Sequence, residues 1–285
     1  MHEELRRWER RGRYLWIRGR RVFYWERGSG PAIVAIHGFP ASSYDWRLVA
    51  EHLDGFRFVA LDLPGFGLSD KHPGDDYSLL AQAGVIEEAV RVLGIRECFL
   101  LAHDMGDSVA AELLARANEG RLTFRVIAAV LLNGSIFIEL AKLTSGQKLF
   151  LALPARRLSF TPPLALFRRQ IRKLFSKEHP ASDEEILMLE RFLAYDGGAR
   201  IIPMTIRYIE ERRQRASRWT SGLVDGPEPL AIVWGEQDPV AVPAIADRLL
   251  TLRPHTEAVR WADVGHWPQL EVPERLSSEL GRLYR

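Results

Sequence analysis

The feature that most constrains the fold is a repeated exchange between short apolar runs and longer stretches with helical spacing. The run AIVAIHG at residues 32–38 is β-branched and continuously apolar, as expected of a strand covered on both faces. FRFVALDL at 56–63, CFLLA at 98–102 and RVIAAVLLN at 125–133 follow, with helical stretches between them. Strand and helix alternate, so the sequence predicts a mostly parallel, doubly wound sheet.

This alternation stops after Asn133. Residues 136–222 hold amphipathic helical stretches and no convincing strand, and carry 16 Lys and Arg against 9 Asp and Glu. The α/β pattern resumes with the strand LAIVWG and the helix AIADRLLTL. We therefore predict a core domain from 1–134 and 223–285, with a helical cap inserted at 135–222; 285 residues with 47% apolar content suffice for both.

The stretch LLAHDMGDSVAAELL, residues 100–114, predicts a strand end, a sharp turn and a helix start. Asp104 stands at the apex of the turn, with Ala102 and Gly106 two positions away on either side. A nucleophile elbow strains its central residue and needs small neighbours at those two positions. An acidic residue can also simply cap a helix, so this stretch alone leaves both interpretations open.

Three other segments favour the elbow. HGFP, residues 37–40, follows a strand at the place where hydrolases of this layout form one side of an oxyanion hole. Asp238 follows a later strand, and His266 follows the last one. The chain order of nucleophile, acid and histidine is the order that this layout uses.

With these motifs the chain resembles the α/β-hydrolase fold superfamily, in the aspartate-nucleophile branch that holds epoxide hydrolases and haloalkane dehalogenases. The resemblance covers almost the whole chain and is most specific in HGFPASSYDW, LDLPGFGLSDK, AHDMGD and GHWPQLEVPE. Within the branch it is most similar to the mesoderm-specific transcript proteins and bacterial epoxide hydrolases. The implied fold is an α/β-hydrolase fold with a helical cap.

The resemblance implies a covalent mechanism. A carboxylate is ionised at neutral pH without a general base, so Asp104 would attack a saturated carbon and form an ester. His266, oriented by Asp238, would then activate water against that ester. The backbone N–H groups of Phe39 and Met105 would hold the oxyanion.

Further residues are expected around the substrate. His37 and Pro40 belong to the oxyanion loop, where His37 supports the loop. Tyr208, in IIPMTIRYIEERR, occupies the place where the resemblance implies a tyrosine that protonates the opening epoxide. Tyr195 is the weaker candidate for a second such tyrosine and is counted as a substrate contact.

The leaving group distinguishes the activities. Haloalkane dehalogenases hold halide with side-chain N–H donors, and neither Met105 nor Phe39 offers one. We therefore expect an epoxide hydrolase, an enzyme acting on ether bonds, that takes a hydrophobic epoxide to a vicinal diol. The alternatives are a haloalkane dehalogenase-like hydrolase and a catalytically silent binding protein of the same fold.

The remaining expectations concern cofactors, partners and location. The histidines outside the triad lack metal-ligand spacing, so we expect no metal and no cofactor. A net charge of +2 gives no reason to expect nucleic acid, and a monomer or homodimer is expected, with a small hydrophobic substrate and water as partners.

The N-terminus is too densely charged for a signal peptide, so a cytoplasmic location is expected. LFRRQIRKLF, residues 166–175, is basic and amphipathic, but a cap helix needs an apolar face anyway. We therefore expect no membrane contact there.

Overall fold

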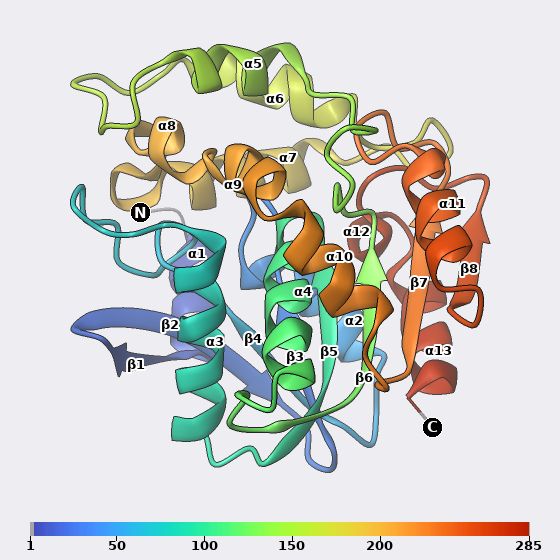
Figure 1. Ribbon diagram of the computed structural model, residues 1–285. Coiled ribbons are helices and arrows are strands. Elements are labelled where there is room, and N and C mark those ends of the chain that lie inside the picture. The colour runs from blue at the N-terminus through green and yellow to red at the C-terminus, as the bar shows by residue number, and fades with distance from the viewer. Residues whose placement is uncertain (1–2, 285) are drawn as a thin grey trace.

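The computed structural model describes residues 3–284, which form one eight-stranded sheet with helices on both faces (Figure 1). The strands lie in the order β1-β2-β4-β3-β5-β6-β7-β8. β2 runs antiparallel to β1 and to β4, and every other pair is parallel. The strands are β1 (Arg13–Ile17), β2 (Arg20–Arg27), β3 (Ala32–Ile36), β4 (Arg57–Leu61), β5 (Glu97–His103), β6 (Arg125–Leu132), β7 (Leu230–Gly235) and β8 (Glu257–Trp261). The predicted mostly parallel sheet is confirmed.

Two helical layers bury the faces of the sheet. One layer contains α3 (Leu79–Val92), α4 (Met105–Asn118) and α11 (Pro243–Leu252). The opposite layer contains α2 (Arg47–Glu51), preceded by a 3₁₀ turn at Ser43–Trp46, and α13 (Pro273–Leu283), preceded by the short α12 (Pro268–Glu271). Every residue of β3 and β7 is buried, which is why these strands read as unbroken apolar runs.

One helix was not expected from the sequence. Residues Glu3–Arg11 form α1, which buries Leu5 and Trp8 against the second layer. The two apolar residues are three positions apart and so share one face, but the surrounding charges hide this spacing. The N-terminal segment is therefore helical over Glu3–Arg11.

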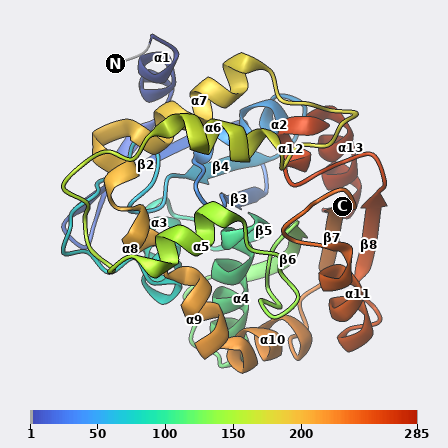
Figure 2. The same ribbon diagram turned by 90° about the horizontal axis from the view of Figure 1, so that it is seen from above.

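The segment between β6 and β7 contains no strand among its described residues, as predicted. Its helices are α5 (Ser145–Ala152), α6 (Leu164–Arg172), α7 (Asp183–Ala194), α8 (Ile202–Thr205), α9 (Tyr208–Gln214) and α10 (Ala216–Val224), with a 3₁₀ segment at Tyr195–Arg200. α5 to α9 lie over the carboxyl ends of the strands (Figures 1 and 2). That edge is where open α/β sheets bind ligands.

The last helix of this segment differs from the rest of the cap. α10 packs along α4 in the layer beside the sheet, and a Cβ on Gly222 would lie 2.5 Å from the Ala111 carbonyl oxygen. The cap covering the sheet edge therefore ends near α9, before the boundary predicted at residue 222. Amphipathic spacing alone does not tell a cap helix from a layer helix, because both need one apolar face.

Candidate active site

The turn between β5 and α4 holds Asp104 in a conformation rare for a residue with a side chain. Its φ is 49° and its ψ is −108°, and the residue is 4% exposed. Two glycines make room for it. A Cβ on Gly106 would lie 2.5 Å from the Ile36 carbonyl oxygen, and one on Gly38 would lie 2.7 Å from the Asp104 Cβ. A strained residue held by such close packing is typical of a nucleophile elbow.

The Asp104 carboxylate lies against backbone donors. The Phe39 N–H donates to Oδ2 over 2.9 Å. Met105 is the first residue of α4, where N–H groups have no partner within the helix. The helix N-terminus also favours negative charge. Phe39 and Met105 thus lie on either side of the position where negative charge would develop.

His266 and Asp238 form a buried pair behind the carboxylate. The His266 Nδ1 lies 2.6 Å from the Asp238 Oδ2, and each residue is 3% exposed. The other carboxylate oxygen, Oδ1, accepts from the Val240 and Ala241 N–H groups at 2.7 and 3.0 Å. These bonds fix the carboxylate so that His266 Nδ1 carries the proton and Nε2 keeps its lone pair for a water.

Asn133 strengthens this arrangement. Its Nδ2 donates to Asp238 Oδ2 and to the Gly235 carbonyl, both at 3.0 Å, and its Oδ1 accepts the Gly235 N–H at 2.9 Å. Asp238 Oδ2 is therefore hydrogen-bonded both to the Asn133 amide and to the His266 imidazole.

The pKa of His266 reflects two opposing effects. Burial alone would lower its pKa, but the carboxylates of Asp238 and Asp104 outweigh burial and raise it above the usual value. The neighbouring His103 behaves differently: burial, with the positive charge of His266, lowers its pKa well below the usual range. His103 Nε2 lies 2.7 Å from the His266 carbonyl oxygen, so it supports the backbone of the triad histidine.

A cavity of about 360 Å³ opens onto Asp104 and His266 beneath the cap. Its lining is mainly apolar, including Leu149, Phe150, Phe160, Leu166 and Phe167. The polar side chains in the lining, besides Asp104 and His266, are Thr144, Gln147 and Gln170. Among the described residues the lining contains no Lys, Arg or Glu and no Trp or Asn.

Tyr208, the expected ring-opening acid, does not line this cavity itself but lies behind Phe39 and Gln147, which do. Its ring packs 5.3 Å from that of Phe39 and borders a second hollow of about 380 Å³ on the other side. Its hydroxyl is hydrogen-bonded to Gln147, whose Oε1 accepts the Thr144 N–H at 2.8 Å. This bond lowers the pKa of Tyr208, which a donor to the phenol oxygen does, so the Gln147 amide nitrogen is the donor. Burial, together with Asp104, raises the pKa of Tyr208 above its usual value, so the hydroxyl stays protonated.

Two residues of this site were missed in the sequence. Arg212, which is 1% exposed, donates from Nη2 to the Asp104 carbonyl oxygen at 2.7 Å and from Nε to the Ser108 Oγ at 2.8 Å. It lies one helical turn after Tyr208, which could have suggested a shared face. Gln147 carried no sequence signal except that Thr144 and Gln147 fit a capping box.

Of the three residues expected to contact the substrate, one lines the cavity and two do not. Pro40 lines the cavity, but His37 and Tyr195 do not. His37 is fully buried, with Nε2 accepting the Leu63 N–H at 3.0 Å and Nδ1 facing the Gly38 carbonyl at 2.8 Å, so it supports the oxyanion loop. Tyr195 packs beside Lys71, whose ammonium lies 5.2 Å from the ring centre. The turn after α7 directs Tyr195 away from the cavity.

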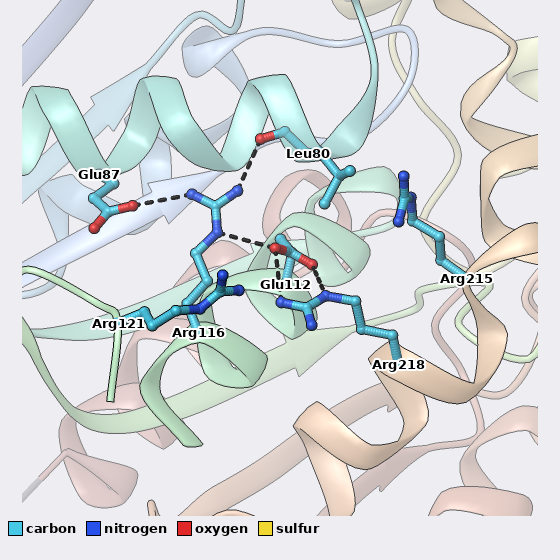
Figure 3. A pocket seen from close by; sticks show the side chains of 7 residues that line it. All are labelled: Leu80, Glu87, Glu112, Arg116, Arg121, Arg215 and Arg218. Atoms are coloured by element: carbon cyan, nitrogen blue, oxygen red, sulfur yellow. Dashed lines mark hydrogen bonds and ion pairs between the residues drawn. The ribbon is translucent and has the colours of Figure 1, made fainter. Parts of the chain in front are cut away.

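An arginine-rich hollow of about 500 Å³ lies outside the cap, between α3, α4 and α10 (Figure 3). Arg116 donates to Glu112, to Glu87 and to the Leu80 carbonyl, and Arg218 donates to Glu112 and Glu119. These guanidinium groups are already paired with carboxylates. The ion pairs between Arg218 and Glu112 therefore hold α10 against α4. The charges that line this hollow are used by these pairs and are not free for a ligand.

The chain is similar to known hydrolases over nearly its full length. The family model described as the alpha/beta hydrolase fold matches residues 31–273. The putative hydrolase LipZ of Mycobacterium tuberculosis is 40% identical over 95% of this chain and 94% of its own. The human mesoderm-specific transcript homolog protein is 33% identical, over 94% and 84%. The bifunctional epoxide hydrolase 2 of Sus scrofa is 26% identical, over 91% and 52%.

A solved structure is similar in fold. The haloalkane dehalogenase DbeA from Bradyrhizobium elkani superposes with a TM-score of 0.79, covering 95% of this chain and 96% of that one at 21% identity. At this identity the likeness concerns the fold.

Proposed function

This chain belongs to the alpha/beta hydrolase fold family, and we propose that it opens a hydrophobic epoxide to a vicinal diol through an ester on Asp104. One observation carries the proposal: the elbow holds a carboxylate, and a buried tyrosine beside it is bonded to Gln147, a residue that lines the cavity. A carboxylate suits attack on saturated carbon, and an epoxide additionally needs an acid for its oxygen. The distant similarity to an epoxide hydrolase is consistent with this activity.

In the first step, Asp104 attacks a ring carbon. Phe39 holds Oδ2, so Oδ1 is the oxygen left to attack. A carbon–oxygen ester bond forms while the ring carbon–oxygen bond breaks, and the released alkoxide takes the proton of Tyr208. Because Gln147 donates to the Tyr208 oxygen, the hydroxyl proton is directed away from Gln147. The product of this step is a hydroxyalkyl ester and a tyrosinate.

In the second step, water hydrolyses the ester. His266 Nε2 takes a proton from water, which attacks the Asp104 carbonyl carbon. The imidazolium is stabilised by Asp238, and the tetrahedral oxyanion accepts from Phe39 and Met105. The ester bond to the alkyl oxygen then breaks, the leaving alkoxide takes the second proton of the attacking water, and the diol leaves with Asp104 restored as a carboxylate. The proton on His266 returns to the tyrosinate through water.

The cavity lining favours a substrate without charge. Its side chains are mainly apolar, and among residues 3–284 no Lys or Arg lines it to pair with a carboxylate or phosphate of a ligand. The side-chain amides in the lining, Gln147 and Gln170, are engaged with Tyr208 and Ser145, so a halide would lack the paired donors that dehalogenases use. A haloalkane is therefore the second candidate substrate.

The proposal is tested with a panel of aryl and alkyl epoxides alongside haloalkanes of matched size, measuring diol and halide release. We expect diol from epoxides and no halide release above that of Asp104→Ala. Halide release without diol would favour the dehalogenase. Failure to turn over either class would contradict the proposed activity.

A further inference from the structure

One stretch of the cap carries charge of a single sign. Residues 140–177 contain nine Lys and Arg and no Asp or Glu. They form α5, α6 and the loop between them, which is the outermost layer above the sheet edge (Figures 1 and 2). We call this stretch the cap flap. Lys148, Arg169 and Lys173 are exposed there and make no ion pair with an acidic residue among residues 3–284.

The same flap exposes large apolar side chains. Leu149, Phe160 and Leu166 are 54%, 60% and 51% exposed, and these are three of the five large hydrophobic residues exposed on the described chain. All three also line the cavity that contains Asp104 and His266. The apolar surface is therefore continuous with the apolar interior of the site.

Cap packing does not require these three residues. The inward face of α6 is provided by Phe167 and Ile171, which pack with Trp267 and α7. Leu166 lies outside that face, and Leu149 is likewise exposed on α5. From the sequence alone we expected residues 166–175 to form an ordinary cap face without membrane contact, but the exposure of these side chains favours the opposite.

We propose that the cap flap docks on an anionic lipid bilayer and that substrate enters the cavity from the lipid. The unpaired cations would attract the anionic phosphate headgroups. The apolar side chains between them would enter the boundary between headgroups and acyl chains. Among the described residues no helix is long and apolar enough to cross a bilayer, so the contact is peripheral. The identity of the substrate rests on the proposed function, whereas the docking does not.

Binding is measured by cosedimentation of the full chain with vesicles of phosphatidylcholine alone and of phosphatidylcholine mixed with phosphatidylglycerol. We expect binding to the mixed vesicles that falls with rising salt, and much weaker binding to phosphatidylcholine alone. The combined variant Leu149→Ser, Phe160→Ser and Leu166→Ser should weaken binding by about tenfold or more. The combined variant Lys148→Gln, Arg169→Gln and Lys173→Gln should weaken binding to the mixed vesicles by a similar factor.

Two control variants change other surfaces equally. Trp16→Ser removes an exposed large hydrophobic side chain on β1, outside the cap flap. The combination Arg13→Gln, Arg96→Gln and Arg248→Gln removes three positive charges, as many as the charge variant of the cap flap, from exposed positions outside it. Both should bind vesicles as the unmodified chain does. No vesicle binding, or equal loss in flap and control variants, would overturn the docking.

Turnover of a water-soluble epoxide without vesicles is measured separately. Its failure would overturn the proposed chemistry while leaving vesicle binding to be judged by itself.

Discussion

The guanidinium of Arg212 reaches from the cap to Asp104 and donates to the backbone carbonyl of that residue over 2.7 Å. The same Nη2 lies 3.8 Å from the Asp104 Oδ1. Burial raises the pKa of Asp107 well above its usual range, and Arg212 opposes this. A single buried cation of the cap therefore faces two carboxyl groups of the elbow and helps to position the nucleophile.

Arg212→Gln should slow formation of the Asp104 ester by about 10- to 100-fold, because a charge-assisted hydrogen bond to the elbow is lost. The free energy of unfolding should fall by about 3–5 kcal/mol, as when one partner of a buried pair is removed. Single-turnover ester formation and denaturant unfolding measure the two effects. Arg213→Gln, on the exposed neighbour, is the control. Equal ester formation in both variants would remove Arg212 from the positioning role.

Tyr208→Phe should slow ester formation by about 10²–10⁴-fold while the chain stays folded, because the leaving alkoxide loses its proton donor. Stopped-flow single turnovers measure the rate. Tyr14→Phe, which removes a half-buried hydroxyl bonded to Glu9 far from the cavity, should leave the rate unchanged. Normal ring opening in a folded Tyr208→Phe variant would exclude this acid.

Gln147→Glu separates the two roles of Gln147. The carboxylate can still accept the Thr144 N–H and keep the start of α5, but it now accepts the Tyr208 hydroxyl instead of donating to it. We expect slower ring opening, because the proton is held by Glu. Gln170→Glu adds the same charge to the cavity wall at a position bonded to Ser145. An equal effect of both variants would mean that charge alone is responsible.

The pH dependence follows from the raised pKa of His266. Burial lowers this pKa, but Asp238 and Asp104 raise it by stabilising the imidazolium. His266 must be neutral to accept a proton from water, so ester hydrolysis should increase as the pH rises through the pKa of His266 in the ester, where Asp104 is uncharged and no longer raises that pKa. Asp104→Asn removes one of the negative charges, so the pKa of His266 should fall. NMR titration of the imidazole measures the change, and a rise would contradict this electrostatic account.

The covalent step predicts where solvent oxygen goes. In a single turnover in ¹⁸O-water with enzyme in excess, the diol should be unlabelled and the peptide containing Asp104 labelled. His266→Gln should form the ester and stall, because no base activates water, and Asp104→Ala should form none. Mass spectrometry measures both products. Labelled diol in the first turnover would show direct attack by water.

The sequence by itself determined the sheet and the order of the triad. Buried parallel strands need unbroken apolar runs, and a strained elbow needs small neighbours, so Ala102, Gly106 and the strands around Asp104 are visible without a structure. Asp238 and His266 follow later strands, and the carboxyl ends of parallel strands meet at one edge. These relations depend on local pattern and chain order.

Only the tertiary structure decided which cap residues meet the nucleophile. Amphipathic spacing gives each helix an apolar face but not its neighbour, so α10 was assigned to the cap although it packs on α4. For the same reason Tyr195 was expected to contact the substrate, although it packs beside Lys71. Spacing also did not predict that Arg212 contacts Asp104 or that Gln147 contacts Tyr208. Contacts between distant segments depend on how helices cross, which is set by the packing of the whole chain.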